Sequence, residues 1–108
     1  MRKSKKMQIV YPTIAANVPT IQTSTTALAD SAGKRIAWNI QNLDTNVLYV
    51  CLGTPASATV FHVVLKAGTG SADGSGGTVG QENGVIFTGP IYVYSAGTPS
   101  YVVLEQKP

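Results

Sequence analysis

The sequence predicts an all-β protein: a single antiparallel β-sandwich or jelly-roll-like barrel of seven or eight short strands, with a flexible basic N-terminal arm. Three observations predict this fold. Apolar residues alternate with polar ones in several short runs, as they do in strands that bury one face. Turn-forming residues separate these runs, and the 108 residues include 11 glycines together with abundant Thr, Ser and Val. No stretch shows a helical period. The length predicts one domain with a modest core, which oligomerisation would help to stabilise.

Residues 1–19 are predicted to form a basic, extended arm, and residues 20–108 the sandwich domain. The arm holds half of the eight basic residues of the chain: Arg2, Lys3, Lys5 and Lys6. From Met7 onward four basic and five acidic residues remain, which gives a net charge of −1. The basic run is either a solvated tail or an anchor that binds an acidic surface or nucleic acid. As an anchor it would include Ile9 and Tyr11 and would become ordered on its partner.

The centre of the domain is predicted to be a β-hairpin. Ile36, Trp38 and Ile40 alternate with small or polar residues, which indicates a half-buried strand. Val47–Leu52 is apolar on both faces and predicts the second strand. Asn42–Asn46 lies between them and is rich in residues that favour turns. The predicted core includes Ile36, Trp38, Ile40, Val50 and Leu52.

Shorter strands are expected on both sides of this hairpin. They are predicted at Gln8–Tyr11, Thr20–Thr26, Val60–Leu65 and Val85–Phe87, with an extended connection at Thr13–Pro19 and a turn region at Ala27–Gly33. In the third of these strands, Phe61 is placed on one face with Val63 and Leu65. A second hairpin is expected to pair Ile91–Ser95 with Tyr101–Glu105. Six of the thirteen residues in Gly68–Gly80 are glycine, so this segment is expected to be a mobile loop.

The residues predict no catalytic, cofactor-binding or metal site, and the protein is not expected to be an enzyme. His62 is the only histidine and no Gly-x-Ser-x-Gly motif is present, which disfavours a Ser-His-Asp site. The single cysteine, Cys51, excludes an internal disulfide and is expected to be a buried, inert thiol. The acidic residues lack the regular spacing of a calcium loop. No apolar run reaches the roughly 18 residues that span a membrane, and no signal peptide is expected.

Tyr92, Tyr94 and Tyr101 form a candidate exposed aromatic face. Tyr92 and Tyr94 share one face of their strand, and the predicted hairpin brings Tyr101 near them. Half-buried packing is the simpler explanation of such a cluster. Alternatively, the tyrosines form a platform for a sugar or a partner subunit, because each offers apolar area with a polar tip.

Several segments resemble the small β-rich virion proteins of tailed bacteriophages, which decorate or cement the capsid or form the base of head fibres. The resemblance covers residues 20–105 in order. It is carried by Thr23–Ala29, Lys34–Leu43, Asn46–Gly53 and Gly89–Thr98. These motifs are structural and carry no active site.

The resemblance implies a non-enzymatic virion structural protein that binds the capsid surface and stabilises or extends the particle. Its partners would be the major capsid protein or other virion proteins, and a homo-oligomer is expected, with a trimer favoured. It would be found on the outer capsid surface of the virion, and in the host cytoplasm during assembly. Neither nucleic acid nor a membrane is an expected partner. A glycan- or receptor-binding module on the virion and a tail or connector component remain alternatives.

Overall fold

The computed structural model describes residues 13–16, 24–70 and 73–108, and only the backbone of Thr13–Ala16. The predicted anchor residues Arg2, Lys3, Lys5, Lys6, Ile9 and Tyr11, and the predicted strand Gln8–Tyr11, lie outside the described residues. The described part of the chain contains strands and turns but no helix. The all-β prediction is confirmed.

Eight strands form in the described residues. They are β1 (Thr13–Ala16), β2 (Thr25–Leu28), β3 (Ala37–Asn42), β4 (Leu48–Leu52), β5 (Val63–Leu65), β6 (Thr78–Gln81), β7 (Ile91–Tyr94) and β8 (Tyr101–Gln106). They build two four-stranded sheets, with the orders β1-β8-β3-β6 and β2-β7-β4-β5. Every neighbouring pair is antiparallel.

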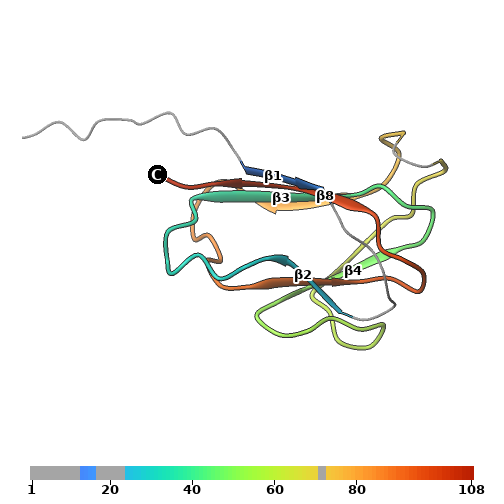
Figure 1. Ribbon diagram of the computed structural model, residues 1–108, viewed down its shortest axis with the longest axis horizontal. Coiled ribbons are helices and arrows are strands. Elements are labelled where there is room, and N and C mark those ends of the chain that lie inside the picture. The colour runs from blue at the N-terminus through green and yellow to red at the C-terminus, as the bar shows by residue number, and fades with distance from the viewer. Residues whose placement is uncertain (1–12, 17–23, 71–72) are drawn as a thin grey trace, which may run out of the picture.

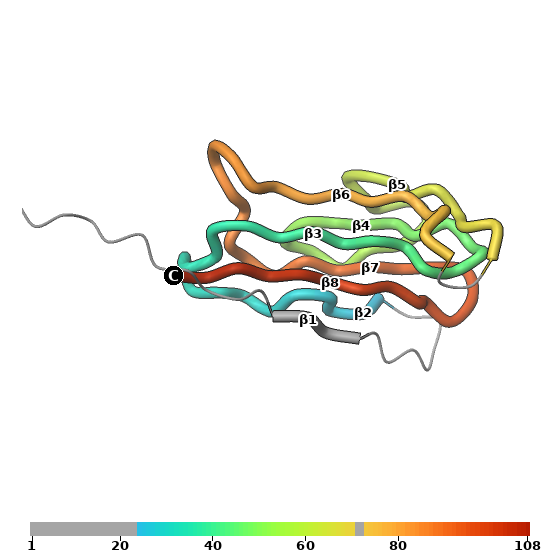
Figure 2. The backbone as a smooth tube through the Cα atoms, turned by 90° about the horizontal axis from the view of Figure 1, so that it is seen from above, coloured from blue at the N-terminus to red at the C-terminus, as the bar shows by residue number. Residues whose placement is uncertain are grey.

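The two sheets pack face to face as the layers of a sandwich (Figure 1). Seen from above, β3 lies over β4 and β8 lies over β7 (Figure 2). The core between the layers consists of Leu28, Trp38, Ile40, Leu48, Val50, Leu65, Ile91, Val93, Tyr101 and Val103. Each fully buried aliphatic side chain contributes about 1.5–3 kcal/mol relative to an exposed one. No described strand pair joins the two sheets, so a closed barrel is wrong and a sandwich is right.

Both predicted hairpins are wrong, although their strands exist. β3 and β4 lie in different sheets, and so do β7 and β8. An alternating pattern determines which face of a strand is buried, but a strand can bury that face against the opposite layer as well as beside a hairpin partner. The connections of residues 43–47 and 95–100 are long enough to cross the roughly 10 Å between packed sheets. Consecutive strands therefore stack across the core.

The predicted core needs one correction. Trp38, Ile40 and Val50 are buried, and Leu52 is half-buried at the edge of the core. Ile36 is 44% exposed. The strand begins only at Ala37, so the alternation does not extend back to Ile36. The Arg35 side chain is buried at this end of the strand instead.

Other boundaries also differ from the predictions. Thr13–Ala16, predicted as a connection within the arm, pairs with β8 as strand β1. The strand predicted at Thr20–Thr26 is found at Thr25–Leu28, with residues 20–23 outside the described part. Val85–Phe87 is not a strand, because the pairing partner of β3 lies earlier, at Thr78–Gln81.

The glycine-rich segment is more closely packed than the sequence predicts. Its last three residues begin β6. A Cβ atom at Gly76 would lie only 2.0 Å from the backbone oxygen of Asn42, so only glycine fits there. The Gly77 N–H donates to the carbonyl of Lys66, and the Gly77 carbonyl accepts from the N–H of Asn42. The end of the segment is therefore part of the sandwich.

Candidate functional site

The most distinctive surface of the described residues is the outer side of the sheet β2-β7-β4-β5. We call it the aromatic face, and it comprises Thr26, Tyr49, Phe61, Val64, Tyr92 and Tyr94. Tyr49 pairs directly with Tyr94 on one side and with Val64 on the other, so these three side chains share a face. The opposite side of the same strands, with Val50 and Val93, faces the core.

Two pairs of rings on this face are in contact, and Tyr49 belongs to both. The ring centroids of Tyr49 and Phe61 are 5.1 Å apart, and those of Tyr49 and Tyr94 are 6.1 Å apart. The rings are tilted by 47° and 41°, within the range of favourable aromatic pairs. Phe61 and Val64 are each 41% exposed. The ring contacts therefore fix the positions of these side chains, and part of their apolar surface remains exposed.

The structure separates the three tyrosines proposed from the sequence. Tyr92 and Tyr94 lie on the aromatic face, half-buried. Tyr101 is on β8 in the other sheet, where it points into the core and is only 5% exposed. Its place in an exposed aromatic face is therefore wrong, because the hairpin that would have brought it there does not form. Burial raises the pKa of the Tyr101 hydroxyl.

The sequence does not predict that Phe61 belongs to this surface. One continuous strand from Val60 to Leu65 was expected, which puts Phe61 on the same face as Val63 and Leu65. The strand instead begins at Val63, so the alternation before that point does not hold. The outward orientation of Val64 follows from the alternation alone, since its neighbour Leu65 lies in the core and is 3% exposed.

Cys51 and His62 lie next to each other beside the aromatic face. The Cys51 sulfur is 3.5 Å from His62 Nδ1, and the Leu52 N–H donates to the same nitrogen at 3.0 Å. A backbone amide can only donate, so His62 Nδ1 is an acceptor and the neutral ring carries its proton on Nε2. The nitrogen nearest the thiol is already occupied as an acceptor. The arrangement ties the segment before β5 to β4 and is not that of an activated nucleophile and base.

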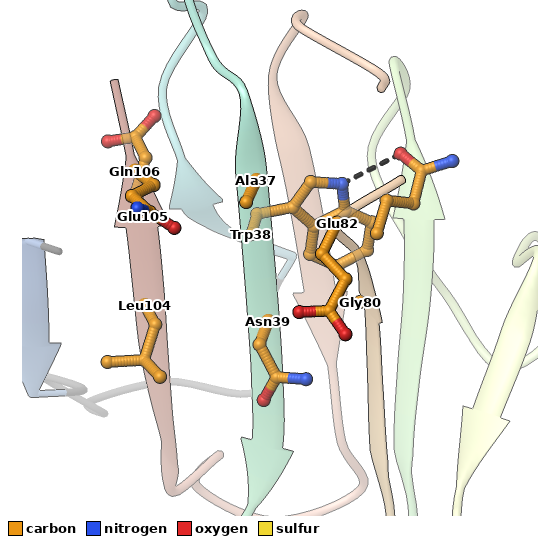
Figure 3. Close-up of a pocket in the computed structure, with 9 residues that line it drawn as sticks. Ala37, Trp38, Asn39, Gly80, Glu82, Leu104, Glu105 and Gln106 are labelled. Atoms are coloured by element: carbon orange, nitrogen blue, oxygen red, sulfur yellow. Dashed lines mark hydrogen bonds between the residues drawn. The ribbon is translucent and has the colours of Figure 1, made fainter. Parts of the chain in front are cut away.

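A shallow depression of about 220 Å³ lies on the outer side of the opposite sheet. Figure 3 shows Asn39, Gly80, Glu82, Leu104 and Gln106 among the residues that line it. Gly80 is one of these residues, and only glycine fits there because a Cβ would lie 2.4 Å from the carbonyl oxygen of Trp38. Its lining residues include the amides Asn39, Gln81 and Gln106, the acidic residues Glu82 and Glu105, and Trp38. The dashed bond in Figure 3 is the Trp38 Nε1–H donating to Gln81 Oε1 at 2.8 Å, which fixes the indole in the core.

Charged residues are almost absent from the strands. Glu105 is the only charged residue within the eight described strands. It forms a buried ion pair of 2.9 Å with Arg35. The remaining charges lie outside the strands, at Asp30, Lys34, Asp44, Lys66, Asp73, Glu82 and Lys107. Hydrogen bonds from the Ser75 hydroxyl and N–H, and from Thr69, hold the pKa of the exposed Asp73 carboxyl below its usual value.

No group of three or more potential metal ligands occurs in the described part of the chain. The same residues include no helix that is long and apolar enough to cross a membrane. No protein-family model, curated protein or solved structure matches the chain. The candidate site therefore rests on geometry alone, and the aromatic face is the best-defined surface.

Proposed function

We propose that this protein is a jelly-roll structural protein of a virus particle that binds the capsid surface and stabilises or extends the particle. The observation that carries the proposal is the nested pairing of the strands. β1 pairs with β8, β2 with β7, β3 with β6, and β4 with β5. A long antiparallel ribbon rolled into two four-stranded sheets has this pairing, and jelly rolls of this kind are typical of viral capsid and lectin domains.

The segments that resemble tailed-phage virion proteins support the same proposal. They include Lys34–Leu43, which contains β3, and Gly89–Thr98, which contains β7. Both strands are central in their sheets. Because one fold can serve many functions, the choice of a virion protein over another jelly-roll protein rests on these motifs and on the charge distribution.

The charge distribution favours the basic N-terminal segment as the anchor. All nine charged residues after Lys6 lie in the described part, and together they give a net charge of −1. Two of them, Arg35 and Glu105, neutralise each other inside the protein. The exposed remainder is scattered outside the strands, so the body offers no strongly acidic surface for four cations. Their proposed target is an acidic surface of the capsid protein.

The test is binding to capsids assembled without this protein, measured by co-sedimentation over a series of salt concentrations. The variant replaces Arg2, Lys3, Lys5 and Lys6 by Gln. We expect it to fold normally and to bind much more weakly, with a smaller salt dependence. Screening of exposed charges acts over about 8 Å at physiological ionic strength, so wild-type binding should weaken as salt is added.

The matched control replaces three exposed cations of the body, Lys34, Lys66 and Lys107, by Gln. It should bind capsids as the wild type does. Equal binding by the arm variant and the wild type at every salt concentration would show that the arm does not anchor the protein. Binding of duplex DNA with a salt slope near one unit of log affinity per phosphate would point to nucleic acid instead.

A glycan-binding module on the virion is the second candidate, and the aromatic face favours it. Sugars stack on aromatic rings, and Tyr49, Tyr92 and Tyr94 combine apolar faces with hydroxyl tips. This function requires saturable binding of a sugar that Tyr92→Ala or Tyr94→Ala abolishes. A sugar screen on the folded chain decides between the two candidates.

A further inference from the structure

Asn83 is followed by glycine, which distinguishes it from every other asparagine of the chain. The other four, Asn17, Asn39, Asn42 and Asn46, precede valine, isoleucine or leucine. The backbone nitrogen of the next residue can attack an asparagine side chain, and a Cβ on that next residue hinders the approach. Glycine has no Cβ and adopts backbone angles that other residues avoid. The sequence therefore contains one position at which this reaction is least hindered.

The structure leaves this position open. Asn83 and Gly84 are both exposed, and the next residue, Val85, is 91% exposed. Gly84 has a φ of 76°, in the region that favours glycine. Among the described residues, neither the side chain of Asn83 nor the N–H of Gly84 has a hydrogen-bond partner. Both groups are therefore accessible to each other and to water.

The fold holds the other described asparagines in place. Asn42 is 1% exposed and donates to the carbonyls of Asn46 and Lys66. Asn39 lies in β3 between β8 and β6, so the backbone that follows it is paired on both sides. The Asn46 side chain donates to the Asp44 carboxylate, and a β-branched valine follows it. These positions should react slowly while the protein is folded.

We propose that Asn83 is a site of spontaneous deamidation in the folded protein, with water as the co-reactant. The Gly84 nitrogen loses its proton and bonds to Cγ of Asn83, while the bond from Cγ to the amide nitrogen breaks and ammonia leaves. Water then opens the resulting succinimide at either carbonyl, which gives aspartate or isoaspartate. Attack within the chain is favoured because the two groups belong to adjacent residues.

The surrounding contacts predict what the modification changes. Gln81 Oε1 accepts from the Trp38 indole and from the N–H of Phe87, and the Phe87 carbonyl accepts from Arg35. Both ends of the loop are thus tied to the sandwich, whereas its tip is exposed, so the fold should be retained. The net charge after Lys6 changes from −1 to −2, and the new carboxylate follows Glu82 directly. This inference does not rest on the virion proposal.

Asp73–Gly74 is the matched case, because aspartate before glycine can form the same succinimide with loss of water. Gly74 also has a positive φ, 85°. However, the Asp73 carboxylate accepts from the N–H and hydroxyl of Ser75 and from the Thr69 hydroxyl. The Ser75 bonds above all lower the pKa of this carboxyl, so it stays ionised and its oxygen leaves poorly. Isoaspartate should therefore form much more slowly at residue 73.

The experiment incubates the full chain at 37 °C and pH 8 and follows each asparagine by peptide mapping with mass spectrometry. Deamidation raises the peptide mass by about 1 Da, and chromatography separates the aspartyl and isoaspartyl forms. We expect product at residue 83 at least about tenfold faster than at any other asparagine, a barrier difference of about 1.4 kcal/mol. Urea unfolding of the modified protein should match that of the fresh protein.

Two variants and one condition serve as controls. Asn83→Gln lengthens the exposed side chain by one methylene, so ring closure is less favourable, and its product should form at least about tenfold more slowly. Ser75→Ala removes a hydroxyl bond from Asp73, and it should increase isoaspartate at residue 73 without changing the rate at residue 83. Incubation of the wild type in concentrated urea gives the rate at each position without the fold.

Three outcomes would overturn the inference. A rate at residue 83 more than about tenfold lower in the folded protein than in urea would show that the loop protects Asn83. Equal rates at Asn83 and at Asn39, Asn42 or Asn46 in the folded chain would show that neither glycine nor exposure selects the site. Absence of product at residue 83 in both states would show that the Gly84 nitrogen does not attack.

Discussion

A buried polar residue lies at each end of strand β3. The residue is charged at one end and neutral at the other. At one end Arg35, 2% exposed, forms an ion pair with Glu105 and donates to the carbonyls of Phe87, Gly89 and Ala29. At the other end the neutral amide of Asn42, 1% exposed, donates to the carbonyls of Asn46 and Lys66 and accepts from the N–H of Asp44.

At both ends, a buried polar side chain connects chain segments that are distant in sequence. Both residues bind backbone carbonyls of connections that leave the two sheets, and neither leaves a buried polar side-chain atom without a partner in the described residues. The charged end combines an ion pair with three hydrogen bonds to carbonyls, whereas the neutral end has three hydrogen bonds and no ion pair. Removal of the side chain should therefore cost more at the charged end.

Arg35→Met should have the largest effect. It leaves the carboxylate of Glu105, whose side chain is 10% exposed, without its partner and frees three carbonyls. Removing one member of a buried ion pair costs about 3–5 kcal/mol. The measurement is the free energy of urea unfolding at pH 7. Lys34→Met is the matched control, since this neighbouring cation is exposed, and it should change stability by less than about 0.5 kcal/mol. A loss below about 1 kcal/mol for Arg35→Met would mean that the ion pair does not hold this end.

The neutral end is tested by Asn42→Ala, for which we expect a loss of about 2–3 kcal/mol. The substitution removes the side-chain partner of the Asn46 carbonyl and the Asp44 N–H, whereas the Lys66 carbonyl still accepts from the Gly77 N–H. Two groups are therefore left unsatisfied, and each costs at least about 1 kcal/mol. If Asn42→Ala and Arg35→Met lower the free energy of unfolding equally, the two ends do not differ in their contribution to stability.

Asn42→Asp sharpens the same comparison, because it introduces a charge at the neutral end. An ionised carboxylate there would face two carbonyl oxygens, so burial should raise its folded-state pKa. Stability should then be greatest in acid and fall as the pH rises from the unfolded to the folded pKa of this group. Unfolding at pH 4 and pH 7 measures the fall. Asn39→Asp, on the outer side of the same strand, should show a much smaller difference.

The fold class, most strands and much of the core could be predicted from the sequence, because alternation reports burial directly. Trp38 and Ile40 illustrate this. The pairing could not be predicted, since the same pattern in Val47–Leu52 suits either a hairpin or a strand of the opposite layer. The role of Arg35 was also hidden: nothing local shows that Glu105, 70 residues later, would meet it inside the protein.

The candidate site was predictable in part, for the same reason. Tyr92 and Tyr94 share a face of one strand, and alternation alone establishes that. Phe61 joins them only because the chain bends before β5, and Tyr101 leaves them only because β8 belongs to the other sheet. Local pattern therefore identifies outward-facing residues, and topology decides which of them meet.

The smallest expected effect concerns Tyr101, which lies directly beside Asn42 in the ladder between β3 and β8. Burial raises the pKa of Tyr101 in the folded protein, so the unfolded chain loses this proton first as the pH rises. The contribution of Tyr101 to stability is therefore complete below the unfolded pKa of about 10 and declines above it. Tyr101→Phe cannot ionise, and it should lose less stability than the wild type between about pH 9 and pH 11. The measurement is urea unfolding across that range, with Tyr92→Phe as the control that retains Tyr101. Parallel declines in wild type and Tyr101→Phe would show that the neutral end of the sandwich does not sense alkaline pH through this residue.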